Sequence, residues 1–193
     1  MRQATVFLFV LTAAISLLEI PLPGLENLFG LTPALLASRP WMLITSLFVH
    51  ANIGHLIQNM VALLIFGAFL EKITGPKKIL LVYFTAGIAG DSASFFFYPD
   101  ALSLGASGAI MGLIGCLTVM RPKASIWFGA ELPVIVFSGL WIATDLIGIF
   151  VPSDVGNAAH LAGFAVGAVF GKMWKKKFSE IREIRKRVRR GLK

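Results

Sequence analysis

The amino-acid sequence predicts an all-α membrane protein, built as a bundle of six transmembrane helices. Hydrophobic residues make up 56% of the 193 positions and charged residues only 15%, and the mean hydropathy is +0.79. A soluble domain of this length is nearer half apolar and a quarter charged. Apolar runs of membrane-spanning length recur along nearly the whole chain, which indicates several spans within one compact domain.

The predicted spans are bounded by proline and glycine, which end helices and form turns. They cover residues 4–20, 53–73, 78–97, 106–120, 132–150 and 157–174. The segment 21–49 is too long for a turn and too often interrupted for a span. We expect it to form a loop between the first two helices that lies partly in the membrane interface, with Trp41 as an interfacial anchor.

The basic residues predict the orientation of the bundle. An even number of spans places both termini on one side, together with the loops around residues 71–78 and 121–131. That side carries 17 of the 18 Lys and Arg residues, and only Arg39 lies on the other. Cytoplasmic loops are enriched in basic residues, so we expect both termini in the cytoplasm. Because no organelle-targeting sequence is evident, we expect a multi-pass protein of a prokaryotic cell membrane.

The C-terminal residues are strongly basic. Eleven Lys and Arg residues occur from Lys172 onward, and we divide the chain into a membrane domain of residues 1–174 and a basic cytoplasmic tail of residues 175–193. Such a tail could bind nucleic acid, but its position directly after a span favours anionic lipid. We therefore expect membrane lipids as a partner of the tail, and no nucleic acid.

Polar side chains gather near the predicted outer ends of three spans. His55 and Asn59 lie in the first turns of the second span, Ser107 opens the fourth, and His160 lies in the first turns of the sixth. Polar groups within a span are costly and usually functional. The predicted order of the spans thus places the glycine-flanked serine and the histidines at one depth, near the outer membrane boundary.

Glycine recurs on one face of the fourth span and on one face of the sixth. These residues are Gly108, Gly112 and Gly115, and Gly163, Gly167 and Gly171. Small residues at this spacing let helix backbones approach closely in a membrane. If the two stripes face each other, the contact carries His160 to the helix that bears Ser107.

These residue types fit nucleophilic catalysis. A serine hydroxyl needs an adjacent base to take its proton, and a neutral histidine suits that role near pH 7. We predict Ser107 as the nucleophile and His160 as the base. The side chains of Asn59 and His55 and the backbone N–H of Ser107 are the expected hydrogen-bond donors to the oxyanion.

The sequence offers no convincing carboxylate for a triad. Asp154 lies in a loop before His160, while Asp145 and Asp91 lie within predicted spans, where we interpret both as hydrogen-bonding packing residues. A serine–histidine dyad is the prediction. A metal site is the rival interpretation of the histidines, but no ligand motif occurs, so we expect no metal and no cofactor.

Four sequence motifs occur in order along the chain. They are PWMLITSLFVHANIGHLIQNM at residues 40–60, FGAFLEKITG at residues 66–75, GASG at residues 105–108 and AHLAGFAVG at residues 159–167. Together they closely resemble the rhomboid family of intramembrane serine proteases. The resemblance covers residues 40–170, essentially the whole predicted bundle.

The resemblance implies a six-helix bundle of rhomboid type, with Ser107 as nucleophile, His160 as general base, and Asn59 and His55 around the oxyanion. It also implies cleavage of transmembrane-helix substrates near the extracytoplasmic face, without a cofactor. The sequence departs from the family at two places. Met42 follows Trp41 where arginine is common, and Met111 stands where an aromatic residue often stacks on the catalytic histidine.

Two alternatives of other classes stay open. A catalytically silent rhomboid-like protein would bind membrane clients without cleaving them, although such proteins usually lose the serine or the histidine. A small transporter is disfavoured, because the spans show no duplicated half and the polar residues stay at one end. For a protease, the fifth span with Phe137 and Trp141 on one face is a candidate substrate gate.

Overall fold

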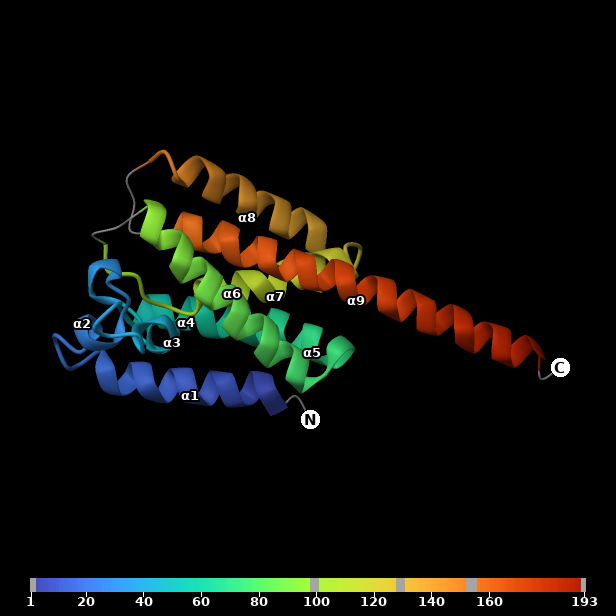
Figure 1. Ribbon diagram of the computed structural model, residues 1–193, viewed down its shortest axis with the longest axis horizontal. Helices are drawn as coiled ribbons and strands as arrows, with labels where there is room; N and C mark the ends of the chain where they lie inside the picture. Colours follow the sequence, from blue (N-terminus) through green and yellow to red (C-terminus); the bar gives the residue numbers. More distant parts are fainter. Residues whose placement is uncertain (1–2, 98–100, 128–130, 152–155, 192–193) are drawn as a thin grey trace.

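The computed structural model describes residues 3–97, 101–127, 131–151 and 156–191, with side chains as far as Lys176. Within these ranges the chain is mostly helical (Figure 1). The long single helices are α1 (Gln3–Glu19), α6 (Pro76–Phe97), α7 (Ser107–Met120), α8 (Val134–Gly148) and α9 (Asn157–Gly191). The predicted second span is one continuous helix assembled from α4 (Ile53–Ala62), the π-helical segment η3 (Leu63–Gly67) and α5 (Ala68–Thr74).

Local chemistry defines both ends of this composite helix. The side chain of Asn52 accepts a hydrogen bond from the backbone N–H of His55 at 2.9 Å, which caps the first turn of α4. At the other end Gly75 has a φ of +86°, a conformation that favours glycine. Pro76 then opens α6, where its missing N–H costs nothing.

The predicted interfacial loop contains four short helical segments. They are α2 (Glu26–Phe29), η1 (Pro33–Leu35), α3 (Met42–Thr45) and η2 (Ser46–Phe48). Its outer surface exposes large apolar side chains, among them Leu28, Phe29 and Trp41. This surface is compatible with a position in the membrane interface, which remains a prediction.

A short β-hairpin joins α7 to α8. Strand β1 (Ser125–Trp127) pairs antiparallel with β2 (Glu131–Pro133), in a register that sets Ile126 opposite Leu132. The sequence indicated only a loop here, with a helix from residue 132. The helix starts instead at Val134, because Glu131–Pro133 is committed to the strand pair.

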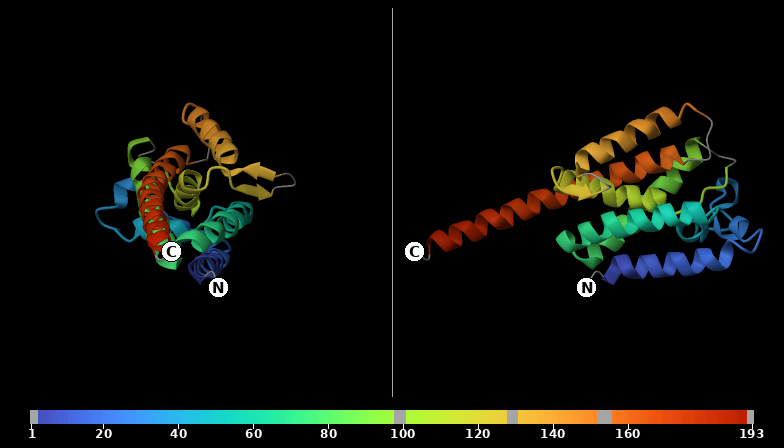
Figure 2. Two further views of the ribbon diagram at one scale, coloured as in Figure 1. Left: turned by 90° about the vertical axis from the view of Figure 1, so that its right-hand side faces the viewer. Right: turned by 180° about the vertical axis from the view of Figure 1, so that it is seen from behind.

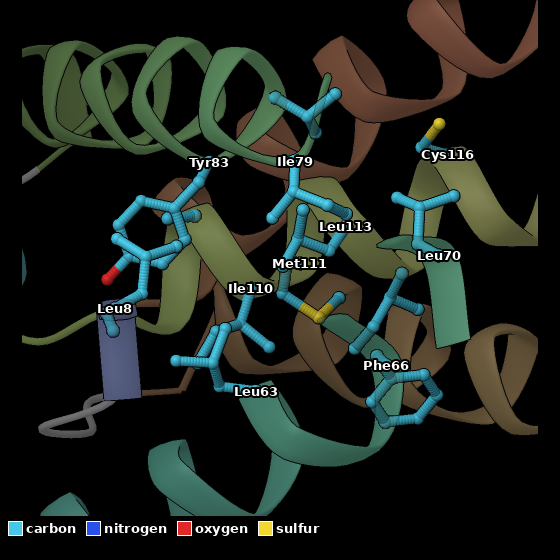
Figure 3. Close-up of a cluster of buried hydrophobic side chains, with 14 of the residues drawn as sticks. Leu8, Leu63, Phe66, Leu70, Ile79, Tyr83, Ile110, Met111, Leu113 and Cys116 are labelled. Carbon is cyan, nitrogen blue, oxygen red and sulfur yellow. The ribbon is translucent and has the colours of Figure 1, made fainter. Parts of the chain in front are cut away.

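Helix α7 lies at the centre of the bundle, and most of its residues are buried. The end-on view in Figure 2 shows it surrounded by α6, α8, α9 and the composite α4–α5 helix. Figure 3 shows part of the hydrophobic core around it. The core residues labelled there are Leu8, Leu63, Phe66, Leu70, Ile79, Tyr83, Ile110, Met111, Leu113 and Cys116.

The helical architecture agrees with the sequence prediction. Every predicted helix start and end, apart from the end of the last, lies within two residues of the observed one. Helix α9 continues past Trp174 to Gly191 and projects from the bundle (Figure 1). Among the described residues, two helices are long and apolar enough to cross a membrane on length and composition, Ile53–Thr74 and Pro76–Phe97, and α1, α7 and α8 are shorter apolar helices. The number of spans therefore stays a prediction.

Candidate active site

The site is built on a backbone contact between α7 and α9. A Cβ added to Gly163 would overlap the carbonyl oxygen of Gly108, and one added to Gly167 would overlap that of Gly112. A Cβ on Gly171 would lie 2.7 Å from the carbonyl oxygen of Cys116. The prediction that the two glycine stripes face each other is confirmed.

This contact brings the first turns of the two helices together. The position for a Cβ on Gly108 lies 3.4 Å from the carbonyl oxygen of Ala159. Ser107 directly precedes Gly108, and His160 directly follows Ala159. Ser107 is partly exposed, whereas His160 is only 6% exposed. Within the part of the chain that the structure describes, no hydrogen bond joins Ser107 to His160. The two residues are neighbours because the helix turns that contain them are in contact.

Two side chains of α8 contact the imidazole of His160. The Oδ1 atom of Asp145 lies 3.0 Å from Nδ1 of His160, and both groups are buried. The ring of Trp141 stands edge-on to the imidazole, with centroids 6.4 Å apart and an interplanar angle of 86°. The hydrogen-bonding role predicted for Asp145 is thus confirmed, and its partner is His160, which the sequence interpretation did not name.

His55 and Asn59 lie on one face of α4, beside the turn that precedes Ser107. Gly105 has a φ of +110°, and the position for its Cβ lies 2.6 Å from Cε1 of His55 and 3.7 Å from Nδ2 of Asn59. Only glycine therefore fits at this position, both for its backbone and for its space. The Nδ2 amide of Asn59 donates to the backbone carbonyl of His55 at 3.2 Å, which orients the side chain. His55 also lies near enough to His160 for an electrostatic interaction.

His50 forms a hydrogen bond with the backbone of the same turn, the one that precedes Ser107. Its Nδ1 lies 2.8 Å from the hydroxyl of Ser16, which donates its proton to the carbonyl of Phe48 at 2.8 Å. Its Nε2 accepts the backbone N–H of Ala106 at 3.4 Å. Nδ1 therefore carries the proton of a neutral imidazole. Burial, together with the neighbouring His55, lowers the pKa of His50 to about 3.

Asp91 of α6 ties the interfacial loop to the segment before Ser107. Its carboxylate accepts the hydroxyl of Ser46 at 2.6 Å and that of Ser103 at 3.4 Å. The carbonyl of Ser46 in turn accepts the N–H of Gly105 at 2.9 Å. The hydrogen-bonding role predicted for Asp91 is thus confirmed, and these bonds hold the turn that presents Ser107.

Other residues that the sequence analysis named lie in different places. Met111 is buried in the core shown in Figure 3, and the aromatic ring beside His160 comes instead from Trp141. Asp154 lies outside the described residues. Among the residues that the structure describes, no group of three or more His, Cys, Asp and Glu is arranged to hold a metal ion.

Sequence reasoning missed two contacts of His160, those with Asp145 and Trp141, although a signal for the contact with Asp145 existed. Asp145 lies three residues before the end of α8, and His160 lies three residues after the start of α9. Two residues equally far from the connection between consecutive antiparallel helices lie at the same depth. Trp141 is four residues before Asp145, so both share one helix face.

Comparison with known proteins gives a consistent assignment. The family model described as "Rhomboid domain" matches residues 37–177. RHOMBOID-like protein 6, mitochondrial, of Arabidopsis thaliana is 35% identical over 135 residues, which cover 69% of this chain and 43% of that protein. Rhomboid-like protease 3 of Toxoplasma gondii is 33% identical, over 77% of this chain and 57% of that protein. Rhomboid protease GluP of Bacillus subtilis (strain 168) is 35% identical, over 66% of this chain and 24% of that protein.

The chain thus spans only about a quarter to three fifths of the length of these relatives. The family match nevertheless covers every long helix of the bundle except α1, because it begins in the interfacial loop and ends within α9. This protein is a membrane protein that belongs to the rhomboid family.

Proposed function

We propose that this protein is an intramembrane serine endopeptidase that cleaves peptide bonds in or near the transmembrane helices of other membrane proteins. The observation that carries the proposal is the backbone contact of Gly108 with Ala159 and Gly163. This contact supports Ser107 and His160 as the reacting residues, because it packs the turn that begins at Ser107 against the turn that contains His160. Membership of a family that includes proteases adds support.

In the proposed reaction, the Oγ of Ser107 attacks the carbonyl carbon of the substrate peptide bond while its proton passes to Nε2 of His160. The C–N bond of the tetrahedral intermediate then breaks, and the imidazolium returns the proton to the departing nitrogen. Water repeats the sequence on the acyl-enzyme, with His160 again as base. This second half releases the acyl group as a carboxylic acid and restores Ser107.

The oxyanion is stabilised in this proposal by Asn59, by His55 and by the backbone N–H of Ser107. The first N–H groups of a helix have no acceptor within that helix, so those of α7 are available to a substrate. The position of Asn59 and His55 beside Gly105 supports their role, since Gly105 lies two residues before Ser107.

The membrane setting belongs to the same proposal. The N-terminal ends of α4, α7 and α9 lie at the end of the bundle opposite the chain termini (Figure 1). With the termini in the cytoplasm of a multi-pass cell-membrane protein, the site lies near the extracytoplasmic face. Substrate helices enter sideways past Phe137 and Trp141 of α8 and unwind locally, because a regular helix hides its carbonyl groups. The basic tail binds anionic lipid.

The proposal is tested with purified protein in detergent and in liposomes. A fluorescent fluorophosphonate should label the wild type, and a helical membrane substrate should be cleaved. Ser107→Ala and His160→Ala should abolish both. Ser92→Ala is the matched control, because that exposed hydroxyl bonds only to the carbonyl of Ile88 in its own helix. Cleavage by Ser107→Ala would refute the assigned chemistry. Binding of the substrate helix with neither labelling nor cleavage would instead favour the client-binding alternative.

A further inference from the structure

The buried carboxylate of Asp145 has one strong partner. Its Oδ1 atom lies 3.0 Å from Nδ1 of His160, and its Oδ2 atom has no hydrogen-bond partner among the described residues. Asp145 is 2% exposed and His160 is 6% exposed. Burying a carboxylate without full compensation is costly, so a residue needed only for helix packing would be expected to bond to backbone or hydroxyl groups of its own helix.

From this geometry we propose that Asp145 is a positioning residue that orients His160 and stabilises its protonated form during the reaction. This inference rests on the proposed protease function. A carboxylate that accepts the Nδ1–H of a histidine fixes the tautomer, and the lone pair of Nε2 is then free to take a proton. Asp145 thereby adds a third member to the predicted Ser107–His160 dyad.

A second contact from the same helix face supports the assignment. Trp141, one turn before Asp145, packs edge-on against the imidazole and also contacts Phe137, with those two ring centroids 5.4 Å apart. Phe137 in turn contacts Phe66 of η3 at 5.0 Å. These aromatic contacts pack α8 against the rest of the bundle. They therefore help to fix the position of the Asp145 carboxylate, which lies on the same helix.

The tautomer of His160 can be measured without any turnover. The chain contains three histidines, so ¹⁵N-histidine labelling gives few signals, and His160→Ala assigns the relevant one. In wild-type protein at neutral pH, long-range ¹H–¹⁵N correlations should show His160 with its proton on Nδ1. Asp145→Ala and Asp145→Asn should lose this pattern or mix it with the Nε2–H form. An unchanged tautomer in both variants would overturn the proposal.

Kinetics test the same assignment. Asp145→Asn keeps the shape of the side chain but removes its charge, and we expect kcat to fall about 10²- to 10⁴-fold with KM nearly unchanged. The acidic limb of the kcat–pH profile should move to lower pH, because the anion that favours the imidazolium is gone. His55 of α4, which also interacts electrostatically with His160, is unchanged in this comparison.

Thr144→Ala is the matched control on α8. Thr144 is exposed and its hydroxyl bonds to the carbonyl of Trp141 in its own helix, so kcat and its pH profile should stay those of the wild type. A fall in kcat for Asp145→Asn that accompanies a lower Tm, with an unchanged pH profile and tautomer, would assign Asp145 a purely structural role. If wild-type protein is labelled by the fluorophosphonate while the Asp145 variants match it in every respect, the protease proposal survives and this inference fails.

Discussion

The backbone of Gly167 lies so close to the carbonyl oxygen of Gly112 that no side-chain carbon fits between α7 and α9. Neither helix offers a flexible side chain at this point, because the atoms in contact are backbone atoms. A methyl group can therefore be accommodated only if the two helices move apart. That movement would also separate the turns that carry Ser107 and His160.

Gly167→Ala should accordingly destabilise the fold. We expect a loss of about 1–3 kcal/mol in the free energy of unfolding in mixed micelles, the usual cost of overpacking, despite the better helix propensity of alanine. Gly139→Ala is the control, since a Cβ at Gly139 of α8 meets nothing within 4 Å. It should leave the stability within about 0.5 kcal/mol. Equal stability of the two variants would contradict the observed contact.

Asp91→Ala should loosen the turn before Ser107. The change removes the acceptor of Ser46 and Ser103, and an unsatisfied buried hydroxyl costs about 1–3 kcal/mol. Because Ser46 also holds the N–H of Gly105, fluorophosphonate labelling should slow as well. Ser94→Ala provides the comparison on the same helix, since its hydroxyl bonds only weakly to its own helix, at 3.4 Å from the carbonyl of Gly90. If both variants label at the wild-type rate, Asp91 does not support the turn.

The helices and their central contact could be predicted from the sequence for simple physical reasons. Proline and glycine mark the breaks between apolar runs, so the observed helix ends fall close to the predicted ones. Glycines at helical spacing leave a backbone stripe, and Gly108 and Gly163 meet as that pattern indicates.

Other features depend on information that local patterns lack. The pairing of Asp145 with His160 depends on the end of α8 at Gly148 and on the rotation of that helix, which a largely apolar segment does not reveal. The bond from Ser46 to Asp91 joins residues 45 positions apart, so it depends on how the whole interfacial loop folds. The three-residue strands of the hairpin are too short to produce an alternating pattern.

Neutral His50 should make the stability depend on pH. Its pKa is lowered to about 3 in the folded protein, against about 6.5 for an exposed histidine. The unfolded chain therefore binds the proton first, and the stabilisation that is present above pH 6.5 is lost as the pH falls from about 6.5 to 3. Between pH 7.5 and pH 4.5 we expect wild-type protein to lose about 3 kcal/mol more unfolding free energy than His50→Gln. The same pH dependence in both proteins would show that His50 is not the titrating group.

Asn59→Ala tests the proposed oxyanion site without removing a reacting group. The Nδ2 amide of Asn59 lies beside Gly105 and donates one hydrogen to the carbonyl of His55, which leaves its second hydrogen for a substrate. Loss of one oxyanion donor typically lowers kcat by about 10²–10³. We expect that loss in cleavage of a helical membrane substrate, with KM and Tm nearly unchanged.

Two further variants sharpen this test. Asn59→Asp keeps the size of the side chain but replaces the donor with an acceptor, so it should be at least as slow as Asn59→Ala. Gln58→Ala changes the exposed neighbouring amide and should cleave like wild type. A wild-type kcat for Asn59→Ala would remove Asn59 from the oxyanion site and leave His55 and the N–H of Ser107 as its donors.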